Sequence, residues 1–211
     1  MAFDSAEVRL QRILDILKNN TFTHRTTILT GSNGSGKSFI RKAIGQKIQL
    51  ELEAVGEKVD RNHLVASVSM ERRTAGDPFC QAMNAFTHDA SWNPTSEETF
   101  RFVQGLLGQN DRYLIIDEPE IGMAEELQML LSNVINDKLL GLKSFGVLII
   151  THSRTIVKNV MHDQFLNMDG LTEEQWLTRE SKLPDYTFEE FTKASHELFL
   201  AIEKRLKEGT R

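Results

Sequence analysis

Residues 31–38, with the sequence GSNGSGKS, fit the pattern G-x-x-x-x-G-K-S/T at every fixed position. A short β-branched and apolar run at 26–30 precedes them, and apolar residues continue at helical spacing after them. Glycines in such a loop let backbone N–H groups turn toward phosphate oxygens at a helix N-terminus, where the helix dipole adds positive potential. The sequence therefore predicts a phosphate loop between a strand and a helix. The predicted nucleotide-binding residues are Gly31, Ser32, Asn33, Gly34, Ser35, Gly36, Lys37, Ser38 and Phe39.

The last two positions of the pattern have distinct expected roles. Lys37 is expected to hold the β- and γ-phosphates, and Ser38 to supply a hydroxyl ligand to Mg²⁺. A second protein ligand for the ion should be a carboxylate at the end of another hydrophobic strand.

Residues 112–118, RYLIIDE, supply that carboxylate. The apolar run predicts a strand buried on both faces, and two adjacent carboxylates at its end have no packing role. Asp117 is the predicted Mg²⁺ ligand, normally through water, and Glu118 is the predicted general base for the attacking water. Pro119 disfavours helical geometry at Glu118 and ends the strand.

A third strand, predicted at 145–150, ends in Thr151-His152-Ser153. A histidine at a strand's carboxyl end can hydrogen-bond a γ-phosphate or orient a water molecule. Together with the two preceding motifs, this position makes His152 a candidate catalytic residue.

Composition limits the class of protein. The 211 residues, 40% hydrophobic and 26% charged, predict one globular domain over 1–211, with an N-terminal helix in 1–20, a core in 26–170 and a C-terminal helix at 187–208. A net charge of −5 gives no global attraction to nucleic acid or anionic membranes, although Arg41, Lys42 and Lys47 leave a local basic face open.

Cysteine and apolar content limit the compartment. Cys80 is the single cysteine, which rules out an intrachain disulfide, and no apolar run approaches the ~20 residues of a membrane span. The first residues lack the features of a secretory signal, so a cytoplasmic location is expected.

Apolar periodicity and capping residues predict the other elements. An N-terminal helix should begin at Asp4 or Ser5 and bury Leu10, Ile13, Leu14 and Leu17. Glu71-Arg72-Arg73 follows a predicted strand and either reaches the nucleotide or forms a solvated turn. The remaining predicted elements are a helix from the phosphate loop to about 56, a strand at 64–70, helices at 95–107, 124–140 and 154–161, an edge strand at 163–170, and a helix from Thr187 with the apolar stripe Phe188, Phe191, Leu198, Ile202 and Leu206.

Taken together, GSNGSGKS, IIDEPE and IITHS resemble the ABC-type ATPase superfamily. Residues 117–122 and 125–128, DEPEIG and EELQ, are most similar to the soluble ATPases of the RecF/OLD-like group. The resemblance spans about 26–169 and implies an α/β, three-layer P-loop NTPase fold with a mostly parallel sheet. Only about thirty residues precede the loop, so the family's N-terminal β subdomain is expected to be reduced, with Phe22 the only nearby aromatic for adenine stacking.

The resemblance also implies two ATP molecules bound between head-to-tail subunits, each completed by the partner's signature loop. That loop falls at 95–99, where Ser96 matches the signature serine but Glu98 replaces a glycine. Ala124 stands where many relatives carry Asp or His, and the family's metal-contacting glutamine could be Glu71 or Gln81.

The expected function is Mg²⁺-dependent ATP hydrolysis by an ATP-driven dimerisation switch. Its expected partners are ATP, a second copy and a protein effector or nucleic acid, in DNA repair, nucleic acid processing or antiviral defence. An alternative is a nucleotide-dependent protein-interaction module with little turnover, motivated by Glu98 and Ala124. A small-molecule kinase would keep the phosphate loop but would not need His152.

Overall fold

A parallel β-sheet forms the centre of the molecule. The computed structural model describes residues 4–54, 56, 65–68, 100, 103–105, 113–141, 146–179 and 187–209. Its five-stranded sheet has the order β2-β3-β4-β1-β5, and every neighbouring pair is parallel. The strands are β1 (Thr26–Thr30), β2 (Val65–Val68), β3 (Tyr113–Asp117), β4 (Val147–Ile150) and β5 (Gln164–Asn167).

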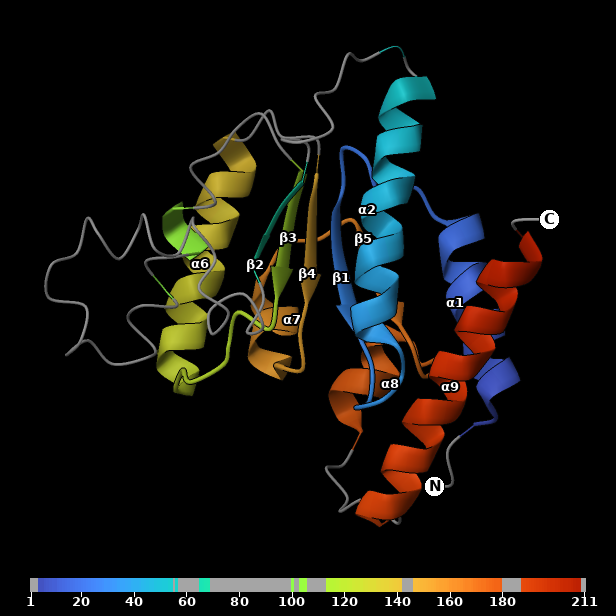
Figure 1. Cartoon of the computed structure of the whole chain (residues 1–211). Coiled ribbons are helices and arrows are strands. Elements are labelled where there is room, and N and C mark those ends of the chain that lie inside the picture. Colours follow the sequence, from blue (N-terminus) through green and yellow to red (C-terminus); the bar gives the residue numbers. More distant parts are fainter. Residues whose placement is uncertain are drawn as a thin grey trace, which may run out of the picture.

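Helices cover both faces of this sheet (Figure 1). One outer layer contains α6 (Glu125–Gly141) and α7 (Arg154–Asn159), and the other contains α1 (Ala6–Asn19), α2 (Lys37–Ala54) and α9 (Phe188–Gly209). A short helix, α8 (Glu173–Thr178), contacts β5. The predicted α/β class, a mostly parallel sheet flanked by helices, is therefore confirmed, and the fold is P-loop NTPase-like. Among the described residues, α1 and β1 are the elements that precede the phosphate loop.

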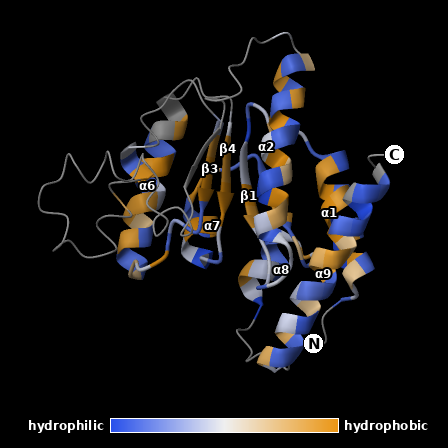
Figure 2. Ribbon diagram, viewed as in Figure 1, coloured by the Kyte–Doolittle hydropathy of each residue, from blue (hydrophilic) through white to orange (hydrophobic). Residues whose placement is uncertain are grey.

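Alternation along the strands divides the core in two. In β1, Leu29 packs with α1, α2 and α9, whereas its neighbour Ile28 packs with α6 and α7. The same alternation holds in β3 and β4, where Ile115 and Leu114 belong to opposite cores. Both faces of the central strands are thus buried, which explains why these segments are continuous apolar runs (Figure 2).

The two terminal helices pack against each other. Ser5, not Asp4, caps α1, and its hydroxyl accepts a hydrogen bond from the backbone N–H of Val8 at 3.3 Å. At the start of α9, Thr187 and Glu190 form the predicted capping box, with hydrogen bonds of 2.6 and 3.2 Å. Both terminal helices are confirmed.

Several details differ from the sequence predictions. Phe188, the first residue of α9, is 81% exposed and stacks on Phe191, so it does not extend the apolar stripe into the core. Leu130 of α6 is an apolar residue within the predicted helix 124–140, yet it is 53% exposed. The helix α8 was not predicted, yet Thr172 and Gln175 form its capping box. Among the described residues, no helix is long and apolar enough to cross a membrane.

Gly146 lies just before β4, at the amino end of the strand, and a substitution there tests how tightly this end of the sheet is packed. Its φ is +132°, and a Cβ there would lie 2.7 Å from Tyr113 Cε2 and 2.9 Å from the carbonyl oxygens of Phe22 and Arg25. We expect Gly146→Ala to reduce the free energy of unfolding by about 2 kcal/mol or more, measured by urea denaturation. The matched control is Gly45→Ala within α2, where an added Cβ meets nothing within 4 Å. This substitution should raise the free energy of unfolding by up to about 1 kcal/mol. Equal urea midpoints for the two variants would contradict the described packing.

Candidate nucleotide-binding site

The strand register brings the three sequence motifs to one edge of the sheet. Leu29 of β1 pairs with Ile150 of β4, and Ile150 pairs in turn with Asp117 of β3. Because β4 lies between β1 and β3, His152 emerges between the phosphate loop (31–38) and the acidic pair. Ligands of open parallel sheets bind beyond the carboxyl ends of the strands, and all three motifs lie there.

The phosphate loop has the backbone geometry of an anion site. Within the described residues, the backbone N–H groups of Gly36, Lys37 and Ser38 donate no hydrogen bond, as expected at the start of a helix. The hydroxyl of Ser35 is buried and likewise lacks a hydrogen-bond partner there. These orphaned polar groups at the N-terminus of α2 fit the phosphates of a nucleotide.

Lys37 is directed back onto its own loop. Its Nζ donates hydrogen bonds of 2.9 Å to the carbonyl oxygens of Gly31 and Ser32. Burial lowers the pKa of Lys37, and the nearby carboxylates, Glu118 and Asp169 foremost, oppose that shift. The ammonium therefore lies among loop carbonyl oxygens and nearby carboxylates.

Asp117 pairs with a residue that the sequence reasoning had assigned elsewhere. Its Oδ2 lies 2.9 Å from Nη1 of Arg41, and the two side chains are 18% and 11% exposed. Burial raises the pKa of Asp117 to about 6, Arg41 and Lys37 counteract this, and Glu118 adds to it. Arg41 lies one helical turn beyond Lys37, so its i+4 spacing was the available signal.

Asp117 and Ser38 present the hard oxygen ligands that Mg²⁺ prefers. Among the described side chains, no group of three or more His, Cys, Asp or Glu could hold a metal ion. Mg²⁺ is usually bound through one or two protein oxygens together with substrate phosphates and water. The residues present therefore fit an ion that arrives with a nucleotide.

Glu118 has an unusual backbone conformation. Its φ is +52°, in the left-handed region, and its backbone N–H donates to the carbonyl oxygen of Ile150 at 2.7 Å. Its Oε1 lies 3.4 Å from Nε2 of His152, and the two side chains are 34% and 36% exposed. The structure thus brings together the predicted general base and the predicted imidazole, at a strained position of the kind that clusters at functional sites.

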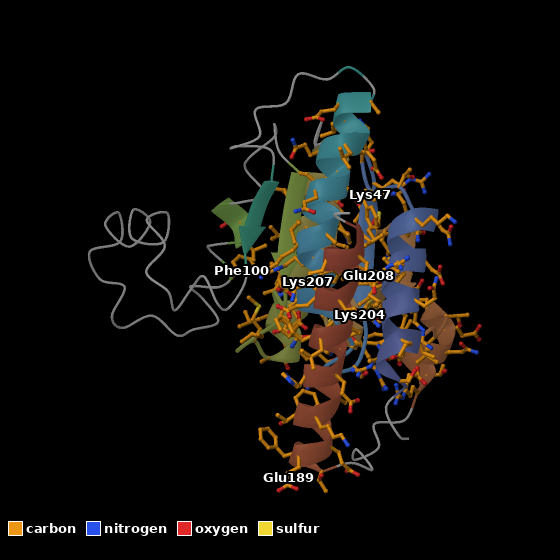
Figure 3. The ribbon with its side chains drawn as sticks, turned by 45° about the vertical axis from the view of Figure 1, so that its right-hand side comes forward. Lys47, Phe100, Glu189, Lys204, Lys207 and Glu208 are labelled. Carbon is orange, nitrogen blue, oxygen red and sulfur yellow. The ribbon has the colours of Figure 1, made fainter. Side chains whose placement is uncertain are left out.

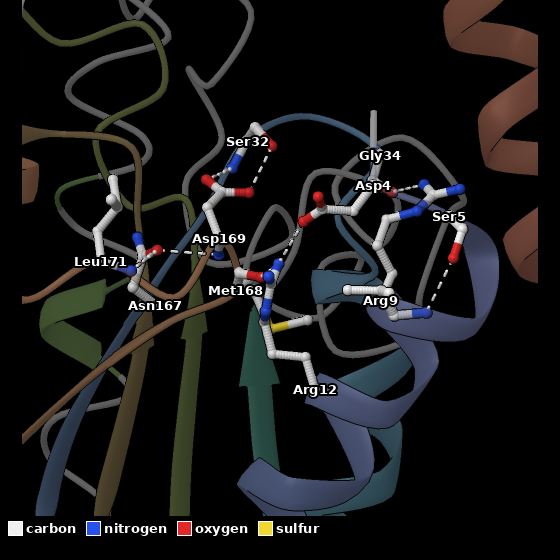
Figure 4. A network of polar contacts seen from close by, with 11 residues as sticks. Asp4, Ser5, Arg9, Arg12, Ser32, Gly34, Asn167, Met168, Asp169 and Leu171 are labelled. Atoms are coloured by element: carbon white, nitrogen blue, oxygen red, sulfur yellow. Dashed lines mark hydrogen bonds and ion pairs between the residues drawn. The ribbon is translucent and has the colours of Figure 1, made fainter. Parts of the chain in front are cut away.

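Asp169 holds the start of the phosphate loop. Its carboxylate accepts hydrogen bonds from the backbone N–H of Ser32 at 2.8 Å and from the Ser32 hydroxyl at 2.7 Å (Figure 4). Sequence reasoning missed this residue, although it follows the carboxyl end of β5 as Asp117 ends β3. Ligands bind beyond the carboxyl ends of parallel strands, and applying this rule to β5 as well would have identified Asp169.

The terminal helices also contact the phosphate loop. Arg9 is only 5% exposed, and its guanidinium donates to the carbonyl oxygen of Gly34 at 3.0 Å (Figure 4). It also donates to the carbonyl oxygen of Ala194 at 2.5 Å. Gly36 has a φ of +99°, and a Cβ there would lie 2.8 Å from Ile13 Cδ1. A side chain would therefore separate the loop from α1.

The structure describes some of the remaining predicted positions, and the others lie outside the described residues. Phe39, in the first turn of α2, is partly buried and packs against the core, while Ser38 and Asn33 are exposed. Phe22 is fully buried, so the idea that it stacks on adenine is wrong. Ser96, Glu98, Glu71 and Gln81 lie outside the described residues.

A local basic face on α2 does not form as suggested. Arg41 is engaged with Asp117, and Lys47 lies 3.5 Å from Glu51. Figure 3 labels Lys47 on α2 and Lys204 and Lys207 on α9; Lys207 pairs with Glu203 at 3.8 Å. Positive side chains on these two helices are therefore interspersed with acids.

No protein-family model matches the sequence, and no curated protein matches it. Among solved structures, the chain is similar to that of C. elegans PCH-2, with a TM-score of 0.40 and 13% sequence identity. The match covers 80% of this chain and 44% of that chain, so this chain spans less than half of its length.

The raised pKa of Asp117 predicts a pH-dependent stability. The folded-state pKa of about 6 exceeds the ordinary 3.8, so the folded chain binds the proton more tightly. Its stabilising contribution should be complete below about pH 4 and lost by about pH 6, up to about 3 kcal/mol at about 1.4 kcal/mol per pKa unit. Urea denaturation between pH 4 and 7 measures this slope.

Asp117→Asn should remove that part of the slope, whereas the exposed Asp137→Asn on α6 should leave it unchanged. Identical slopes for wild type and Asp117→Asn would show that the Asp117 carboxylate is ordinary in the folded chain.

Proposed function

We propose that this protein binds and hydrolyses ATP with Mg²⁺ as a member of the ABC-type superfamily, close to its soluble RecF/OLD-like ATPases. One observation carries the proposal: parallel register sets the phosphate loop, Asp117-Glu118 and His152 along one sheet edge, with Glu118 Oε1 3.4 Å from His152 Nε2. The likeness of the three motifs to that superfamily supports the finer assignment.

Each residue has a role in this proposal. The N–H groups at the start of α2 and Lys37 bind the β- and γ-phosphates. Ser38 and Asp117 hold Mg²⁺, which neutralises phosphate charge when bound. Glu118 accepts the proton of the attacking water, and His152 orients the γ-phosphate or that water.

Nucleotide binding must replace contacts that the chain makes within itself. Lys37 would exchange the carbonyl oxygens of Gly31 and Ser32 for phosphate oxygens. Asp117 would keep one oxygen on Arg41 or release it to turn toward the metal site. Both exchanges trade one charged or polar partner for another, so neither buried charge is left uncompensated.

We further propose that ATP drives head-to-tail dimerisation, with Ser96 of each subunit contacting the nucleotide of the other. The dimer would switch a protein effector or a nucleic acid in repair, nucleic acid processing or antiviral defence. These proposals rest on the superfamily resemblance.

A second candidate is a nucleotide-dependent interaction module with little turnover. It is favoured by the pairing of Asp117 with Arg41, which occupies one of the two carboxylate oxygens that could bind the metal ion. Phosphate release measured beside gel filtration, with and without ATP, separates the two candidates.

Lys37→Ala should abolish ATP binding and steady-state hydrolysis, because it removes the cation expected to hold the phosphates. The matched control is Lys42→Ala, an exposed lysine on the same helix, which should retain both. Phosphate release and calorimetric titration with Mg–ATP are the measurements. Wild-type turnover by Lys37→Ala would contradict the assignment of the loop.

Glu118→Gln should keep Mg–ATP affinity but lower kcat about 10²–10⁴-fold, because the amide cannot accept the proton of the attacking water. With ATP it should also accumulate as a dimer in gel filtration. The exposed Glu126→Gln on α6 serves as the control with unchanged turnover. Continued turnover by Glu118→Gln would rule out Glu118 as the base.

A further inference from the structure

We infer that Glu120 is a positioning residue for hydrolysis, which holds the backbone of His152 and thereby sets its imidazole against Glu118. The inference rests on the proposed function. Glu120 lies in the turn after β3 (118–122), and its Oε1 accepts a hydrogen bond of 2.7 Å from the backbone N–H of His152 after β4. A hydrogen bond to an ionised acceptor is stronger than one between neutral groups.

The backbone and the side chain of His152 both face the turn 118–122. Its backbone N–H binds Glu120, and its ring Nε2 lies 3.4 Å from Glu118 Oε1. The preceding residue, Thr151, is fully buried and donates its backbone N–H to the carbonyl oxygen of Leu29 at 3.1 Å. Thr151 is fixed by β1 and Ser153 by Gln128, and the contact to Glu120 holds the backbone of His152 between them.

The turn that carries Glu120 is itself fixed. The backbone N–H of Ile121 donates to the carbonyl oxygen of Glu118 at 3.2 Å, and that of Met123 to the carbonyl oxygen of Glu120 at 2.9 Å. Because its turn is fixed, the Glu120 carboxylate can hold the backbone of His152 in a defined position. Placement to within fractions of an ångström is what a group that orients a reacting water requires.

Glu120 is not explained by stability. Its Oε2 is buried and has no hydrogen-bond partner among the described residues, which is unfavourable for a carboxylate. At Ser153, the residue after His152, a neutral side chain from α6 makes a comparable contact: Gln128 accepts from the Ser153 hydroxyl at 2.5 Å and donates to the carbonyl oxygen of Met123 at 2.9 Å. A carboxylate held with an unsatisfied oxygen beside Glu118 and His152 is the local conflict expected at functional sites.

The test compares Glu120→Ala with Glu120→Gln, whose amide oxygen can still accept the His152 N–H. We expect Glu120→Ala to lower kcat about 10–100-fold with the KM for ATP unchanged within about 3-fold, and Glu120→Gln to recover most of the loss. The urea midpoint of Glu120→Ala should stay near the wild-type value, because the lost hydrogen bond is offset by removal of the unsatisfied oxygen. Glu125→Ala, which removes the exposed 3.1 Å contact between α6 and Thr155 of α7, is the matched control with unchanged kcat.

A double-mutant cycle with His152→Ala isolates the route of the effect. If Glu120 acts through His152, Glu120→Ala should cause no further loss of kcat in the His152→Ala protein. The inference is overturned if Glu120→Ala turns over like wild type, or if it lowers kcat by the same factor with and without His152. A wild-type protein that binds Mg–ATP but never hydrolyses it would instead overturn the proposed function, and this inference with it.

Discussion

The parallel register of β1, β4 and β3 is the constraint on which the site depends. Leu29, Ile150 and Asp117 lie in register, so residues that are far apart in the sequence leave the sheet side by side. The alternating side chains of these strands bury two cores, one on each face, and a slip of one residue would exchange them. The packing of the cores therefore also fixes the phosphate loop, the acidic pair and the imidazole relative to one another.

The charges at this edge balance one another without a nucleotide. Lys37 binds carbonyl oxygens of its own loop, Arg41 pairs with Asp117, and Asp169 holds Ser32. Because buried charges are tolerated only when they are paired or hydrogen-bonded, these contacts let the site fold before ligand binds. Under the proposed function, a bound nucleotide would have to replace the contacts that Lys37 makes with its own loop. Arg9 of α1 also links the phosphate loop to α9, because its guanidinium donates to the carbonyl oxygens of Gly34 and Ala194.

Local patterns were sufficient to predict the strands, most helices and the three motifs, because apolar runs and loop chemistry are encoded by adjacent residues. They were insufficient for Arg9, whose burial depends on a carbonyl at Ala194, and for Arg41, whose partner lies on another element. Both are charged residues that periodicity assigns to solvent. Phe188 was misplaced for the opposite reason: its spacing fits the stripe of α9, but it is the first residue of that helix and remains exposed. Contacts between distant segments decided the placement of Arg9 and Arg41, whereas position within the helix decided that of Phe188.

The central claim is that one triphosphate meets the phosphate loop, Asp117-Glu118 and His152 at the same sheet edge. A crystal structure of Glu118→Gln with Mg–ATP tests it most directly. In that structure the N–H groups of Gly36, Lys37 and Ser38 should bind the phosphates, the ion should lie beside Ser38 and Asp117, and His152 should lie at the γ-phosphate. A nucleotide bound away from residues 31–38, or one whose γ-phosphate faces neither residue 118 nor His152, would contradict it.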